Sequence, residues 1–372
     1  MPQTPPAQLP PPERPDILSA VLGFALAALI ARRPSHQGTT PDGAVVAARP
    51  TPPSAGMTDT HGRTASRPSE IPARGWRDIL WRLYGQFNED RILSVAAGIT
   101  FYALLALFPA IATLVSLYAL FADPGTIQSH LDTLKGILPG GAIDVVGEQL
   151  KRINAKGHTA LGFGFVISLA LSLWSANAGV KALFDGLNVA YEEHEERSFV
   201  TLTLTSLLFT LGAILFLIAA LTVVVVVPAV LEFFGMKSMT DELIAVLRWP
   251  AIAVMAGLAF SLLYRFGPSR TKPQWRWISW GSGFAAIAWL LISAAFSWYT
   301  ANFGTYNETY GSLGAAIGFL TWVWLSVTVL LIGAELNAEM EHQTAHDTTT
   351  GGSRPMGQRG ASVADTLGKE AN

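Results

Sequence analysis

Six long apolar runs, separated by polar segments, constrain the fold of this chain more than any other feature. They cover residues 92–122, 160–180, 199–231, 243–264, 278–299 and 313–336. Each reaches the roughly 20 residues that a helix needs to cross a bilayer, and none alternates at every second position as barrel strands do. Only helices and closed barrels satisfy their backbone groups in lipid. The sequence therefore predicts an all-α, polytopic transmembrane bundle of about six spanning helices.

Composition agrees with a membrane protein and narrows the chemistry. Only 14% of the 372 residues are charged, whereas soluble domains carry about 25%. The chain has no cysteine, which excludes disulfides, thiolate metal sites and cysteine nucleophiles. The net charge of -2 creates no field that would attract nucleic acid. We expect membrane lipids as partners and no nucleic acid; a homo-oligomer and an envelope protein partner are both compatible with the sequence.

The two ends of the chain are polar. Residues 1–71 hold more than half of the 22 prolines, so we expect a disordered extension there, and a second disordered segment, a cytoplasmic tail, over 343–372. An apolar island interrupts the first extension at residues 17–31. As a helix it rises only about 22 Å, less than the roughly 30 Å hydrocarbon core. The island is either a short surface or disordered segment or a seventh span. It is otherwise a signal peptide, or the start codon is mispredicted and Met57 is the true start.

Two polar regions have helical periodicity. From Trp76 to Phe87 apolar residues recur every three or four positions, which predicts an amphipathic helix. This helix either lies in the membrane interface or packs beneath the bundle. The first loop between runs repeats apolar residues at the same spacing, with a break at Pro139. We expect two amphipathic helices there that cap the outer face.

Lysine and arginine residues set the orientation of the bundle, because cytoplasmic loops carry more of them. The richer set precedes the first run and fills the loops after the second and fourth runs. Both termini and the even-numbered loops are therefore expected in the cytoplasm. The richer set is Arg63, Arg67, Arg74, Arg77, Arg82, Arg91, Lys181, Arg197, Arg265, Arg270, Lys272 and Arg276.

No motif indicates catalysis. The sequence has no Gly-rich phosphate loop ending in Lys and Ser or Thr, and no H-E-x-x-H. His194 stands in an acidic run that reads as a solvated charge cluster. His342 and His346 are spaced as two ligands on one helix face would be, although chance in a polar tail explains them equally well. We expect no catalytic residue, no metal site and no cofactor.

Polar residues at or inside the apolar runs are more informative, because each one is costly in lipid unless it is paired or hydrated. Arg248 stands about one turn inside the fourth run. Together with five residues near the ends of the second and sixth runs it forms a candidate polar membrane path. The alternative is that these side chains reach the headgroups from helix ends. The other five residues are Lys181, Asp185, Asn188, Glu335 and Asn337.

Small residues such as Gly314 and Gly318 indicate close helix packing.

Several motifs, in order, are similar to those of the YihY/BrkB family of bacterial inner-membrane proteins. They are A-A-G-I-T-F-Y-A-L from Ala96, L-N-V-A-Y from Leu187, L-Y-R-F-G-P from Leu263, Y-G-S-L-G-A from Tyr310 and G-A-E-L-N from Gly333. The resemblance covers roughly residues 76–342 and leaves out the proline-rich N-terminal region.

The resemblance implies six spans in one domain over 72–342, an inner-membrane location and no transferable catalytic residue. The family was formerly labelled ribonuclease BN, and no nuclease motif in this sequence supports that label. Its BrkB branch is linked to serum resistance. Two functions stay open: transport or export of a lipid or other amphipathic envelope component, and a non-transporting scaffold that binds an envelope partner through the first outer loop. A hydrated polar path would favour transport, and a tightly packed bundle with an exposed apolar patch would favour the scaffold.

Overall fold

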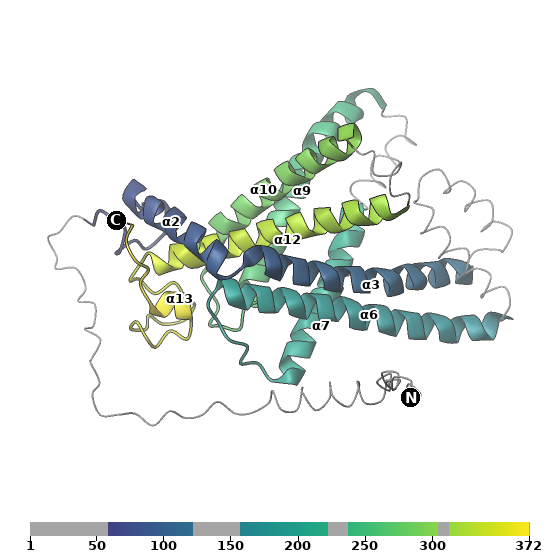
Figure 1. Ribbon diagram of the computed structural model, residues 1–372, viewed down its shortest axis with the longest axis horizontal. Helices are drawn as coiled ribbons and strands as arrows, with labels where there is room; N and C mark the ends of the chain where they lie inside the picture. The colour runs from purple at the N-terminus through teal and green to yellow at the C-terminus, as the bar shows by residue number, and fades with distance from the viewer. Residues whose placement is uncertain (1–58, 122–156, 222–236, 304–311, 372) are drawn as a thin grey trace, which may run out of the picture. The chain divides into compact units, whose positions relative to one another are not determined.

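The computed structural model describes residues 59–121, 157–221, 237–303 and 312–371, all within one compact unit, Ala55–Asn372 (Figure 1). Side chains are described for a smaller set of the helical residues. The apolar island at 17–31 and the amphipathic helices expected in the first outer loop lie outside the described residues, as do residues 222–231 of the third apolar run.

Long helices occupy all six apolar runs within the described part of the chain. Their bounds often exceed the runs, because polar residues continue the same helix beyond its apolar stretch. They are α3 (Ile92–Phe121), α6 (Gly157–Ala190), α7 (Phe199–Leu221), α9 (Lys237–Phe266), α10 (Trp275–Phe303) and α12 (Ser312–His342). The described residues thus confirm an all-helical fold.

Four of these helices are long and apolar enough to cross a membrane within the described residues. Their spans are Phe199–Phe216, Trp249–Phe266, Trp275–Thr300 and Ala316–His342, and α3 adds the shorter apolar stretch Ile92–Ala106. Large apolar side chains such as Phe199 and Leu208 are about 70% exposed, as expected of a surface covered by lipid tails. The total of six spans and the cytoplasmic position of the termini remain predictions.

Helix α12 is central to the packing, since it contacts α2, α3, α6 and α10 (Figure 1). Helices α3 and α6 pack along each other, α9 packs on α10, and α7 packs on α6. The core contains fully buried Phe184, Leu187, Tyr264 and Leu331. The hydroxyl of Tyr264 donates to the carbonyl of Leu330 at 2.8 Å, which satisfies this buried phenol across the α9–α12 contact.

Helices α10 and α12 approach each other closely at two glycines, Gly281 and Gly333. A Cβ on Gly281 would collide with the carbonyl of Gly333 and with the side chain of Asn337. Asn337 Oδ1 accepts the N–H of Gly281 at 2.9 Å. Close contact through small residues was expected at Gly314 and Gly318, yet a Cβ on Gly318 would meet no described residue within 4 Å.

Helix α2 (Ala73–Glu89) confirms the predicted amphipathic helix and combines its two interpretations. One face, with Asp78, Ile79 and Arg82, is buried and packs against α12. The other face exposes more than half of Leu80 and Trp81, side chains suited to the membrane interface.

The segments beside the bundle differ from the expected disorder. Residues 59–71, with the 3₁₀ helix η1 (Pro68–Glu70), and residues 343–371, with α13 (Ser362–Asp365), pack at the end of α12. Buried Arg359 donates to the carbonyls of Ala345 and Ala364, each at 2.6 Å. The hydroxyl of Thr344 donates to Ala65 O at 2.6 Å. Composition missed this order because hydrogen bonds rather than a large apolar core hold these segments.

Candidate functional site

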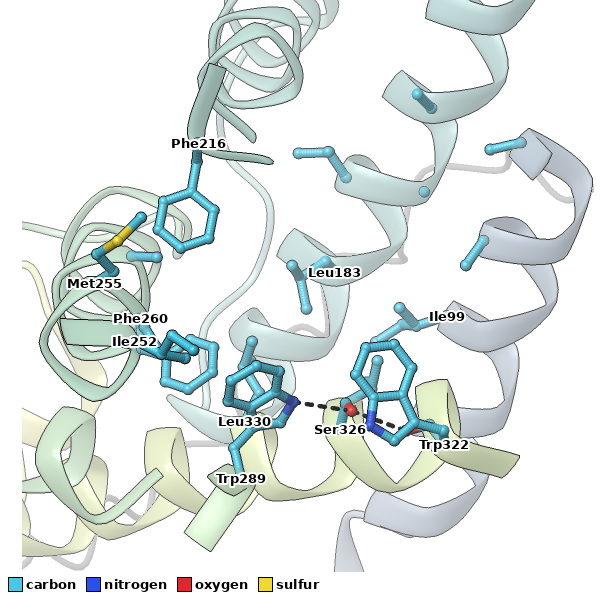
Figure 2. Close-up of a pocket in the computed structure, with 18 residues that line it drawn as sticks. Ile99, Leu183, Phe216, Ile252, Met255, Phe260, Trp289, Trp322, Ser326 and Leu330 are labelled. Atoms are coloured by element: carbon cyan, nitrogen blue, oxygen red, sulfur yellow. Dashed lines mark hydrogen bonds between the residues drawn. The ribbon is translucent and has the colours of Figure 1, made fainter. Parts of the chain in front are cut away.

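An apolar cavity of about 750 Å³ lies between the helices of the bundle (Figure 2). Residues from α3, α6, α7, α9, α10 and α12 line it, so every long helix contributes to its wall. Its volume falls within the roughly 300–1,000 Å³ of pockets that bind small ligands.

The cavity exists because its wall is built from small side chains. Three helices, α3, α6 and α9, place alanine or glycine where a larger residue would fill the space. A Cβ on Gly179, for example, would touch only Tyr102 among the described residues, at an ordinary 3.9 Å. The small residues of the wall are Ala103, Ala106, Ala176, Gly179, Ala256 and Ala259.

Aromatic residues complete the wall, and their polar atoms are already paired. The indole N–H of Trp289 donates to Ser326 Oγ at 3.1 Å, and Ser326 donates to the carbonyl of Trp322 at 2.8 Å (Figure 2). Trp322 in turn donates its indole N–H to Ser293 Oγ at 3.1 Å. None of the described lining residues carries a charge. The cavity therefore presents hydrocarbon and aromatic surface to whatever occupies it.

Such a wall selects its occupant by the hydrophobic effect. Burying apolar surface is favourable in proportion to its area, about 0.8 kcal/mol for each CH₂ group taken from water. A polar headgroup would find no free donor among the described lining residues. A hydrocarbon chain, or the apolar part of an amphipathic molecule, fits this chemistry.

The residues of the predicted polar path do not line this cavity in the described part of the chain. Lys181 donates to Thr203 Oγ1 at 2.8 Å and lies 4.9 Å from the centre of the Phe199 ring, so it joins α6 to α7. The side chain of Asp185 is exposed. Arg248 belongs to α9, but its side chain lies outside the described residues.

Two further residues of the predicted path are buried in structural roles. Asn188 accepts the backbone N–H of Ser269 at 2.8 Å and donates to Glu195 at 3.2 Å, so it fixes the end of α6 to neighbouring loops. Hydrogen bonds, chiefly from Arg197, oppose the effect of burial on Glu195 and lower its pKa. Asn337 bridges α10 and α12 as described above.

Glu335 is the remaining member of the predicted path. Its side chain is buried, with 2% of the residue exposed, and its Oε1 has no partner among the described residues. It faces the carboxyl of Asp90, at the turn between α2 and α3. Glu335 therefore interacts with Asp90, and it contributes neither to the cavity wall nor to a path with Lys181 and Asp185.

A network of buried charges where α12 ends was not anticipated. Arg82 pairs with Glu339, and Arg270 pairs with Glu341 at 2.6 Å. Glu339 and Glu341 stand in the polar end of α12, where the sequence alone does not reveal their tertiary partners. Among the described residues, no three His, Asp or Glu side chains are grouped to hold a metal ion. His342 instead contacts the hydroxyl of Thr366 at 2.7 Å.

Comparison with known proteins places the chain in a family. The ribonuclease-like protein YfkH of Bacillus subtilis (strain 168) is 29% identical over 70% of this chain and 94% of its own length. The UPF0761 membrane protein MS0032 of Mannheimia succiniciproducens is 26% identical over 68% of this chain and 86% of its own length. The UPF0761 membrane protein IL2447 of Idiomarina loihiensis is 26% identical over 70% of this chain and 90% of its own length. No solved structure matches the chain.

The family described as Virulence factor BrkB matches residues 83–356, which include all six long helices and the cavity between them. This range is well over half of the chain. The resemblance of the sequence motifs and the match of the family agree, and this protein is a membrane protein of the BrkB family.

Proposed function

We propose that this protein binds the hydrocarbon portion of a lipid, or of another amphipathic envelope component, in its apolar cavity and moves that molecule in the bacterial inner membrane. The observation that carries the proposal is the 750 Å³ cavity within a bundle of apolar helices, whose described lining residues carry no charge. A bundle that served only as a scaffold would have no use for such a space. The polar headgroup stays outside the cavity in this scheme.

The proposal changes the expected mechanism. A hydrated polar path was the feature expected of a transporter, whereas the described lining residues provide an apolar compartment. We propose transport rather than a ribonuclease activity, because RNA is a polyanion and would find no cationic groove in this cavity. The scaffold alternative depends on the first outer loop, which lies outside the described residues.

A lipid flux assay with purified protein in liposomes tests the proposal. The liposomes carry a phospholipid with a fluorescent group that a membrane-impermeant reagent quenches in the outer leaflet only. We expect the wild-type protein to expose inner-leaflet lipid to the reagent well above protein-free liposomes. A parallel assay with small ions should show no comparable flux.

Matched variants connect this flux to the cavity. Ala259→Phe and Ala103→Phe place a ring into the space from α9 and α3, and each should lower lipid flux several-fold. Leu258→Phe and Leu105→Phe alter neighbouring, outward-facing positions, 60% and 45% exposed, and should leave it unchanged. Lipid flux that equals protein-free liposomes, or that falls equally in both groups, would contradict the proposal.

A further inference from the structure

The turn between α2 and α3 brings a second carboxyl group to Glu335. Asp90 is the C-cap residue of α2, and the chain turns at Arg91, whose φ of 51° is unusual for a residue other than glycine. This turn holds Asp90 against α12, where its carboxyl faces that of Glu335.

The contact between Asp90 and Glu335 brings hydrogen-bond acceptors together without a donor. Asp90 Oδ2 and Glu335 Oε1 are both buried, and neither has a hydrogen-bond partner among the described residues. Ionised carboxylates can only accept hydrogen bonds, so two of them in contact leave both oxygens unsatisfied. A buried polar group without a partner is costly, and a buried unpaired charge costs much more. One proton between the two carboxyls supplies the missing donor.

The surrounding negative charges also favour protonation of the Asp90–Glu335 pair. Glu89 from α2, Glu192 from the segment after α6 and Glu339 from α12 all face Asp90 as like charges. Glu339 and Glu192 also face Glu335. The nearby cation Arg82 is engaged by Glu339 Oε2 and by Gln343 at 2.8 Å. The side chain of Arg91 is exposed. No described ion pair neutralises either member of the pair.

We propose that Asp90 and Glu335 form a proton-binding site in which the two carboxyls share a single proton at neutral pH. Two like charges in contact cannot both ionise without a large penalty, which is the behaviour of coupled carboxyl pairs. Burial raises the pKa of Asp90, and the carboxylates of Glu192 and Glu89 raise it further. Release of the proton puts two negative charges face to face and weakens the contact of α12 with the α2–α3 turn.

This site is independent of the proposed lipid transport, and its test requires no flux. Infrared spectroscopy of the protein in lipid nanodiscs distinguishes a protonated carboxyl, by its C=O stretching band, from an ionised carboxylate. We expect a protonated-carboxyl band at neutral pH in the wild-type protein that disappears in Glu335→Gln. Glu370→Gln removes a carboxylate that is 54% exposed and faces neither Asp90 nor Glu335, and it should leave the band in place. A wild-type band that Glu335→Gln leaves intact would overturn the proposal.

A stability measurement keeps the proposal testable if Glu335→Gln folds poorly. A carboxyl whose pKa is raised on folding contributes stability at low pH, and that stability is lost as pH rises through the raised value. The unfolding temperature of the wild-type protein should therefore fall between mildly acidic and alkaline pH. Asp90→Asn supplies a permanent donor to Glu335 and should flatten this fall, whereas Glu370→Gln should not. If the unfolding temperature depends on pH in the same way in the wild type and in Asp90→Asn, the two carboxyls do not share a proton.

Discussion

Arg270 and Glu341 form an ion pair in which both side chains are completely buried, with 2.6 Å between Arg270 Nη2 and Glu341 Oε2. A second hydrogen bond joins Nη1 to Oε1 at 3.2 Å. The hydroxyl of Thr348 donates to the same carboxylate at 2.6 Å, and the guanidinium lies 5.0 Å from the centre of the Tyr191 ring. Burial opposes the positive charge, but Glu341 outweighs it and raises the pKa of Arg270. The pair fixes the α9–α10 loop to the end of α12.

Glu341→Gln should destabilise the protein by about 3–5 kcal/mol, because it leaves the Arg270 guanidinium buried without a counter-charge. Thermal unfolding in detergent micelles measures the loss. Glu370→Gln is the control: the Glu370 side chain is 54% exposed and lies 3.5 Å from Arg63, so its removal should cost about 0–1 kcal/mol. Similar losses in the two variants would show that the buried pair is not a major contributor.

Asp78 joins residues 59–71 and residues 343–371 to α2, and it makes the stability of this contact depend on pH. It contacts His61 Nδ1 at 2.6 Å and accepts the backbone N–H of Ala371 at 3.0 Å. Burial alone would raise its pKa, but these hydrogen bonds outweigh burial and lower it. The carboxylate therefore contributes stability above the ordinary aspartate pKa of about 4, and this contribution is lost as pH falls through the lowered value.

Asp78→Asn should loosen residues 365–371 at neutral pH, whereas the wild-type segment should loosen only in acid. Hydrogen exchange followed by mass spectrometry measures this directly. Asp185→Asn, an exposed position on α6, should leave exchange in the segment unchanged. If the segment exchanges equally fast in wild type and Asp78→Asn at neutral pH, the carboxylate does not hold it.

Gly281→Ala should destabilise the protein by about 1–3 kcal/mol, since a methyl group there meets the backbone carbonyl of Gly333, which cannot move without shifting α12. Gly283 is two residues further along the same helix, and a Cβ there meets no described residue within 4 Å. Gly283→Ala should therefore be neutral or stabilise by up to about 1 kcal/mol through helix propensity. Unfolding temperatures of the two variants decide; a Gly281→Ala protein as stable as the Gly283→Ala protein would refute the close contact.

The helices could be predicted from the sequence because a long apolar run in lipid has few other ways to satisfy its backbone. Their polar extensions were missed: α9 begins at Lys237 and α12 continues to His342, beyond the apolar stretches. Hydropathy marks where a helix is apolar, not where it ends. The order of 343–371 was missed for a related reason, since buried Arg359 and Thr344 are held by hydrogen bonds that composition does not reveal.

The cavity and the carboxyl pair could not be predicted, because both depend on tertiary contacts. Alanines on α3, α6 and α9 read as packing positions in each helix, and only their convergence leaves a space. Glu335 was a candidate for function from its cost in an apolar helix, but its partner Asp90 stands at a helix end far away in the sequence. Polarity within an apolar run identifies a residue that needs a partner without identifying the partner.

Photolabelling with a phospholipid that carries a diazirine on its acyl chain tests the central claim most directly. The label attaches to residues that the chain contacts, and peptide mass spectrometry locates it on α9. Lipid inside the cavity should label the lining residues Met255 and Phe260, and Ala259→Phe should remove that labelling while outward-facing Val254 stays labelled. Labelling confined to Val254 and other outward positions in the wild-type protein would contradict a lipid-binding cavity.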